Sequence, residues 1–158
     1  MNNNPKQANY SKNKKYLSDE LKYNEFVNKL SLEKLDADTF NQSVQVFALV
    51  FACPERSQVT MTQFRNFYSE FDALYQHFLL LENPDDFVGT ILFRLKLLLP
   101  KLAYNQGRNH VSVEFYNLIQ KSIGCVRTKD HFENLKILLE STLGYYTLFT
   151  ENKPILNS

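Results

Sequence analysis

The hydrophobic positions along the chain recur at intervals of three and four residues, which is the spacing of one face of an α-helix. The clearest series consists of Phe64, Phe67, Tyr68, Phe71, Leu74, Tyr75 and Phe78. Similar series predict helices over about 18–30, 38–52, 60–78, 84–107, 111–123 and 128–149. Only four Gly and five Pro leave little material for the tight turns of an all-β protein. The pattern therefore predicts an all-α protein, a compact bundle of about five to six helices.

Residues with capping preferences mark two of the expected helix starts. Thr60 can accept a hydrogen bond from the backbone of Gln63 while the Gln63 side chain returns one to the backbone of Thr60. Asn83 is a favoured cap, and Pro84 suits the first helical position. Pro100 lies inside the helix that follows, where a proline removes a hydrogen bond. A kink or a restart of this helix is expected there.

The length of 158 residues is that of one domain. Residues 1–17 are rich in Asn and Lys and nearly free of aliphatic side chains, so they are expected to form a disordered tail. Residues 18–149 are expected to form a single helical-bundle domain, and residues 150–158 a C-terminal tail. The N-terminus has no apolar signal segment, and no apolar run is long enough to span a membrane. These features indicate a cytoplasmic protein.

The formal net charge is only +1, so a surface for nucleic acid would have to be a local patch. Residues 87–113 supply one, because they contain no Asp or Glu and carry Arg94, Lys96, Lys101 and Arg108. Three of these cations are seven residues apart and therefore lie near one side of a helix. Such a row suits a phosphate chain. The alternative is that these are ordinary solvated side chains.

Aromatic stacking on RNA bases is a weaker possibility in the same segment. Phe87 and Phe93 are assigned to the core, which leaves Tyr104, and one ring is a poor stacking platform. Tyr104 is therefore expected to be a packing residue whose hydroxyl finds a partner.

Signatures of enzymes and metal sites are missing from the sequence. The three histidines are scattered, and no HExxH motif, glycine-rich phosphate loop or nucleophile elbow is present. Cys53 and Cys125 are single cysteines and are expected to be reduced core thiols. We therefore expect no catalytic residue, no metal ligand and no cofactor.

Two motifs carry a family resemblance. The segment Thr60–Tyr68 reads TMTQFRNFY, and residues 99–104 read LPKLAY before Gly107 and Arg108. Together with the order of the expected helices, they make the chain resemble, over roughly residues 40–146, the small helical subunit of type III-A CRISPR effector complexes, the Csm small subunit. One departure is Asn66, since relatives often have Lys or Arg after the motif arginine.

The resemblance implies a non-catalytic, RNA-binding helical bundle that serves antiviral defence. Several copies would line the inside of a ribonucleoprotein filament and hold target RNA paired to the CRISPR guide RNA, in contact with other copies of itself and with the backbone and large subunits of the Csm complex. The residues expected on the RNA backbone are Arg65, Arg94, Lys96, Lys101 and Arg108. Two other readings are a helical protein–protein adaptor or homodimer with no RNA role, and a small acid–base or metal-dependent enzyme.

Overall fold

The computed structural model describes residues 18–53 and 59–151, and within them it contains helices and no strand. A first helix covers residues 18–28. The others are α2 (Ala37–Ala52), α3 (Met61–Leu79), the π-helical turn η1 (Phe87–Leu92), α4 (Phe93–Gly107), α5 (Val113–Cys125) and α6 (Lys129–Glu151). The predicted all-α bundle is confirmed. The expected tail over 1–17, and all of the expected C-terminal tail beyond Glu151, lie outside the described residues.

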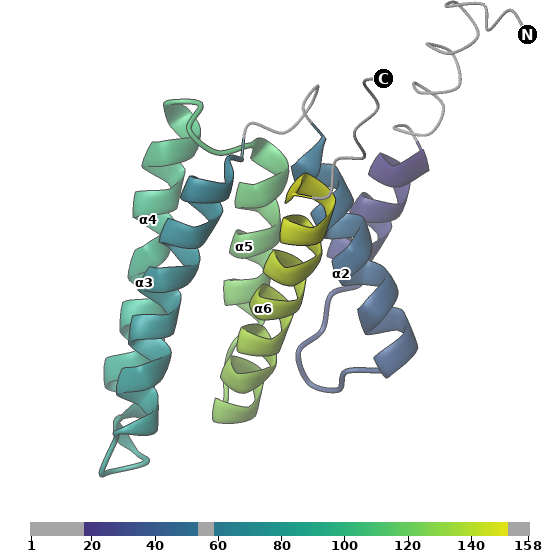
Figure 1. Cartoon of the computed structure of the whole chain (residues 1–158). Helices are drawn as coiled ribbons and strands as arrows, with labels where there is room; N and C mark the ends of the chain where they lie inside the picture. The colour runs from purple at the N-terminus through teal and green to yellow at the C-terminus, as the bar shows by residue number, and fades with distance from the viewer. Residues whose placement is uncertain (1–17, 54–58, 152–158) are drawn as a thin grey trace, which may run out of the picture.

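The helices stand side by side with their long axes roughly aligned (Figure 1). The antiparallel pair α3 and α4 forms one side of the bundle, α5 and α6 lie in the middle, and α2 with the first helix forms the other side. Contacts between α4 and α5, between α3 and α6, and between α2 and α6 connect these parts. One face of α4 therefore packs on the bundle, while no other described element covers its opposite face.

Phenylalanine rings make up much of the core. The fully buried ones are Phe47, Phe51, Phe64, Phe71, Phe115 and Phe132. The ring of Phe115 on α5 lies 5.2 Å from that of Phe51 on α2 and 5.0 Å from that of Phe64 on α3, in edge-to-face geometry. Such pairs contribute beyond their buried area. Phe115 therefore joins three helices at the centre of the bundle.

Local capping sets the start of α3 as the sequence predicts. Thr60 Oγ1 accepts a hydrogen bond from the Gln63 backbone at 3.2 Å, and Gln63 Oε1 accepts one from the Thr60 backbone at 3.2 Å. Val59 just before this capping box is buried, and its carbonyl accepts from the Tyr146 hydroxyl at 2.8 Å. The chain thus enters α3 in a direction that α6 also constrains.

The helix that contains Pro100 is irregular at its start, before α4, and not at the proline. The carboxamide oxygen of Asn83 accepts from the Asp85 backbone at 3.0 Å, and the wide turn η1 follows before α4 begins at Phe93. α4 then continues through Pro100 to Gly107, so the predicted restart there is wrong. Pro100 and Lys96 are both exposed, and water can satisfy the carbonyl of Lys96 that the proline leaves without an intrahelical partner.

Three apolar side chains on η1 and α4 are not in the core, although Phe93 was assigned to the core and Tyr104 was expected to be a packing residue. The expected partner of the Tyr104 hydroxyl is present, since Arg108 donates to it. Val88 is 61% exposed, Phe93 is 59% exposed and Tyr104 is 62% exposed. The buried residues of η1 and α4 are Phe87, Ile91, Leu95 and Leu102. A helix that packs on its neighbours with one face cannot bury apolar residues all round.

Candidate nucleic-acid interface

Two of the predicted RNA-binding cations face α3 from α4. Lys101 Nζ lies 2.6 Å from Glu70 Oε1, and Arg94 Nη1 donates to His77 Nδ1 at 2.7 Å. Glu70 and His77 are seven residues apart on α3, and so are Arg94 and Lys101 on α4. Because the two helices are antiparallel, the two contacts follow one another along the helix pair. We call these four residues the α3/α4 edge. The expectation that no anion lies beside the cation row is wrong at Lys101, because α3 brings Glu70 to it.

Arg108 is held by an aromatic side chain instead. It caps the C-terminus of α4, and its Nη1 donates to the Tyr104 hydroxyl at 2.8 Å. The guanidinium carbon lies 5.5 Å from the centre of the Tyr104 ring, a cation–π distance. Lys96 is exposed and makes no ion pair within the described part of the chain. These two cations thus have no carboxylate partner there.

Arg65 lies apart from the other cations. Its Nη2 is 3.4 Å from Glu151 Oε1 at the end of α6. Since five residues separate Arg65 from Glu70, their side chains leave α3 in directions about 140° apart. The structure therefore places Arg65 on the α6 side of α3 and Lys101 on the α4 side, so these two predicted RNA-binding residues do not lie together. Both side chains are more than half exposed, at 56% and 61%.

The outward face of α4 carries an exposed apolar row that the sequence analysis missed. Its members are Phe93, Leu97, Pro100 and Tyr104, and we call them the α4 ridge. They follow one another at intervals of four, three and four residues, which places them along one line of the helix. By the same geometry Lys96 borders the ridge on one side, and the row of Arg94, Lys101 and Arg108 borders it on the other. The spacing was visible in the sequence, but the burial was not.

A contrasting charged cluster joins α3 to α6. Lys136 contacts Glu140, its Nζ lies 3.3 Å from the Tyr68 hydroxyl and 3.9 Å from Asp72 Oδ1, and it lies 5.0 Å from the Tyr75 ring centre. The Tyr68 hydroxyl also donates to Glu140 at 2.6 Å. Burial, together with the hydrogen bond to the Glu140 carboxylate, raises the pKa of Tyr68 to about 12. The Lys136 side chain is only 16% exposed, so this cluster holds two helices together.

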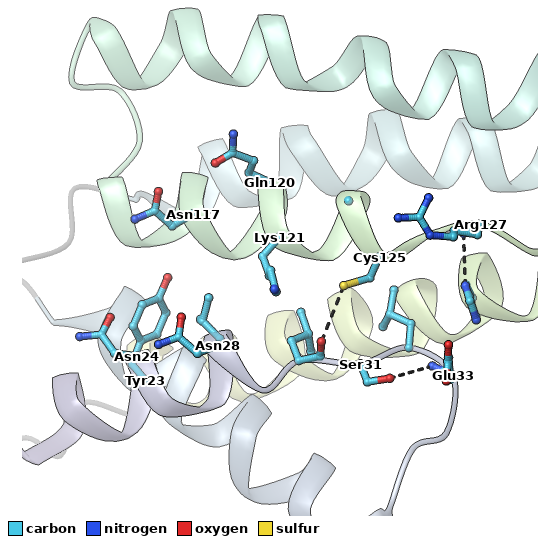
Figure 2. Close-up of a pocket in the computed structure, with 15 residues that line it drawn as sticks. Tyr23, Asn24, Asn28, Ser31, Glu33, Asn117, Gln120, Lys121, Cys125 and Arg127 are labelled. Carbon is cyan, nitrogen blue, oxygen red and sulfur yellow. Dashed lines mark hydrogen bonds between the residues drawn. The ribbon is translucent and has the colours of Figure 1, made fainter.

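A separate polar groove of about 730 Å³ runs between the first helix and α5 (Figure 2). Amide side chains line both walls, namely Asn24 and Asn28 below and Asn117 and Gln120 above, with Lys121 between the walls and Arg127 at one end. Glu33 is the one carboxylate among its lining residues. None of the predicted RNA-binding residues lies here. The two walls are far apart in the sequence, so no local pattern pointed to this groove.

The described residues contain no group of three or more His, Cys, Asp or Glu side chains that is placed to hold a metal ion. Cys53 and Cys125 are free thiols, the first buried and the second half-buried. None of the helices within the described ranges has the length and apolar character needed to cross a membrane.

Comparison with known proteins identifies the family. The model of the family described as Csm2 Type III-A matches residues 34–152, which is most of the chain and includes α2 through α6. Neither the curated proteins nor the solved structures contain a significant match. The family match covers both sequence motifs and the whole α3/α4 edge. The chain therefore belongs to the Csm2 Type III-A family, the small subunits of type III-A CRISPR effector complexes.

Proposed function

We propose that this subunit binds the backbone of the guide and target RNA of its effector complex, without reading sequence and without catalysing a reaction. Arg65, Arg94, Lys96, Lys101 and Arg108 are the proposed contacts. In this proposal several copies act together in the cytoplasm, each touching its neighbours and the backbone and large subunits. The observation that carries the proposal is the acid-free segment 87–113, whose four cations remain exposed on α4.

The carboxylate partners of Lys101 and Arg65 do not prevent this role. Both ion pairs are exposed, and exposed pairs contribute about 0–1 kcal/mol. A phosphate group offers a comparable charge-assisted hydrogen bond. RNA can therefore replace Glu70 at Lys101, and Glu151 at Arg65, at little cost.

Contacts of this kind suit a subunit that must accept any target. Arginine and lysine on a rigid helix bind phosphate oxygens, which carry no sequence information. If four cations of one copy each neutralise a phosphate of a single strand, the logarithm of the binding constant falls with the logarithm of salt with a slope of about −3. One copy binds weakly, and several copies along one RNA bind tightly through effective concentration.

The test is a pair of charge-reversal variants of the full-length protein, each replacing one Lys and one Arg. Lys101→Glu with Arg108→Glu changes α4, and Lys121→Glu with Arg127→Glu changes the polar groove. Binding to two RNAs of unrelated sequence is measured by fluorescence anisotropy over a range of salt. We expect the α4 variant to weaken binding to both RNAs by roughly tenfold or more, with a smaller salt slope.

The groove variant is the matched control and should bind both RNAs about as well as the parent. The proposal is contradicted if the α4 variant binds like the parent, or if it loses affinity for only one of the two sequences. A larger loss in the groove variant would instead assign RNA binding to the surface between the first helix and α5.

A further inference from the structure

We infer that the α4 ridge is a stacking surface for unpaired RNA bases, so that this face of the subunit binds single-stranded RNA more tightly than duplex. The inference rests on the proposed RNA-binding function and adds to it the form of RNA that the site prefers. It starts from the exposure of Phe93 at 59% and of Tyr104 at 62%. The two rings belong to one exposed apolar row, and contiguous exposed apolar surface of this kind marks interaction sites.

The two rings lie along one line of the same helix. Eleven residues separate Phe93 from Tyr104, which corresponds to about 16 Å along the axis of α4. Leu97 and Pro100 fill the line between them, and both are exposed. A strand that follows this line meets a ring near each end and an apolar floor between the rings. This is the form of a platform on which bases stack without regard to sequence.

The Tyr104 ring is held in place from one side. Arg108 donates to its hydroxyl at 2.8 Å, and the guanidinium carbon lies 5.5 Å from the ring centre. An Arg that contacts one face of an aromatic ring leaves the other face for a base, and the ring is largely open to solvent. The same Arg108 is a proposed phosphate contact. Stacking and phosphate binding are therefore adjacent at this end of α4.

The charges beside the ridge favour a nucleic acid over a protein as its occupant. Lys96 borders the ridge on one side, and Arg94, Lys101 and Arg108 border it on the other. Residues 87–113 themselves contain no Asp or Glu, and the carboxylate that α3 brings to this border, Glu70, makes an exposed ion pair with Lys101 that a phosphate can replace. An apolar row between two cationic borders matches a strand whose bases are flanked by phosphates. Bases of a duplex are stacked on one another and cannot reach the rings, so the rings act on unpaired bases.

The experiment compares one double variant that removes both aromatic rings with another that keeps both. Phe93→Leu with Tyr104→Leu removes both rings and keeps apolar bulk, while Phe93→Tyr with Tyr104→Phe keeps both rings. Each full-length variant is titrated with one RNA as a single strand and as a duplex, and a fluorescent base analogue in the strand reports stacking. Loss of the rings should weaken single-strand binding by roughly tenfold or more. It should also abolish quenching of the analogue and leave duplex binding within about twofold.

The ring-retaining variant should bind the single strand as the parent does. Because all the changed side chains are exposed, the thermal melts of both variants should match that of the parent. Equal affinity of the leucine variant and the parent for the single strand would overturn the inference. So would an equal loss for strand and duplex, or a loss of assembly with the other effector subunits while RNA binding is unchanged.

These results separate the inference from the proposed function. If the Lys101→Glu and Arg108→Glu variant loses RNA binding while the leucine variant does not, backbone binding stands and base stacking is refuted. If neither variant loses RNA binding, both proposals fail.

Discussion

The two edges of α3 use lysine in different ways. At the α6 edge, Lys136 is 16% exposed and is surrounded by Asp72, Glu140 and the hydroxyl of Tyr68. At the α3/α4 edge, Lys101 is 61% exposed, and within the described residues its ion pair is with Glu70. Both ammonium groups connect the same helix to a neighbour. Burial and the number of partners determine that the first stabilises the bundle and the second remains accessible to a ligand.

The physical reason lies in desolvation. Burial by itself lowers the pKa of Lys136, but the hydrogen bonds with Glu140 and Tyr68 outweigh it and raise that pKa. A phosphate approaching this group would have to displace several partners at once. At Lys101 it displaces one carboxylate in a solvated position, where an ion pair contributes little. Substitutions around Lys136 should therefore lower stability, whereas substitutions around Lys101 should change RNA affinity and leave stability nearly unchanged.

The largest expected effect is on folding. Lys136→Ala removes the cation that Asp72 and Glu140 share, and hydrogen bonds to charged groups contribute about 1.5–3 kcal/mol. We expect the free energy of unfolding, measured by urea denaturation, to fall by about 1–3 kcal/mol. Lys101→Ala is the control and should change it by less than about 1 kcal/mol. Equal losses in the two variants would remove the distinction between the edges.

A smaller loss of stability is expected from Tyr68→Phe. The change removes the hydroxyl that donates to Glu140 and accepts from Lys136, and it keeps the ring. We expect the free energy of unfolding to decrease by about 1 kcal/mol. Tyr104→Phe makes the same chemical change on the exposed α4 ridge and should be nearly neutral. A melting temperature that drops equally for both would show that exposure does not separate these tyrosines.

Removing the competing carboxylate at the α4 edge should strengthen RNA binding. In Glu70→Gln, Lys101 no longer has to leave an anionic partner in order to bind phosphate. The affinity for RNA should therefore rise by roughly threefold, while the free energy of unfolding changes by less than about 1 kcal/mol. Glu151→Gln makes the same change beside Arg65. A gain in affinity for Glu151→Gln would support Arg65 as an RNA contact, and its absence would confine binding to α4. Weaker RNA binding by Glu70→Gln would contradict the proposed competition.

The smallest expected effect is the loss of stability at low pH. Hydrogen bonds from Lys136 and from Tyr68 lower the pKa of Glu140. A depressed pKa contributes stability above the ordinary glutamate pKa, and this is lost as the pH falls through the lower pKa of the folded state. Because the Glu140 side chain is half exposed, we expect the free energy of unfolding to fall by only about 0.5 kcal/mol as the pH is lowered through this range. Glu140→Gln should lack this part of the pH dependence. An acid denaturation curve identical to that of the parent would argue against the contribution of Glu140.

Local sequence signals were reliable where a few neighbouring residues decide the structure. The capping box of Thr60 and Gln63 forms as predicted, and Thr128 Oγ1 accepts from the His131 backbone at 3.2 Å at the start of α6. Phe64, Phe67 and Phe71 of the phenylalanine repeat on α3 are buried as their spacing indicates, and Phe78 is half-buried. Such features depend on backbone geometry over one or two turns, and the sequence states them directly.

The candidate site was predicted less well, because it depends on which helices become neighbours. The sequence marked Lys101 by its acid-free surroundings on α4, yet Glu70 lies beside it from α3. Arg65 belongs to the same motif as the start of α3, yet its contact is Glu151, 86 residues further along the chain. Charge counted along a segment does not include the charges of the helices that pack against it.

The sequence alone determined that the chain is helical, where most helices begin and end, and which family motifs it carries, because periodicity and capping act over short distances. Only the tertiary structure decided that Phe93 and Tyr104 are exposed, that Lys101 has a carboxylate partner and that Lys136 does not reach solvent freely. Those properties follow from the number and position of neighbours packed around each helix. The apolar residues of α4 exceed what one packed face can cover, and the arrangement of the bundle selects those that remain outside.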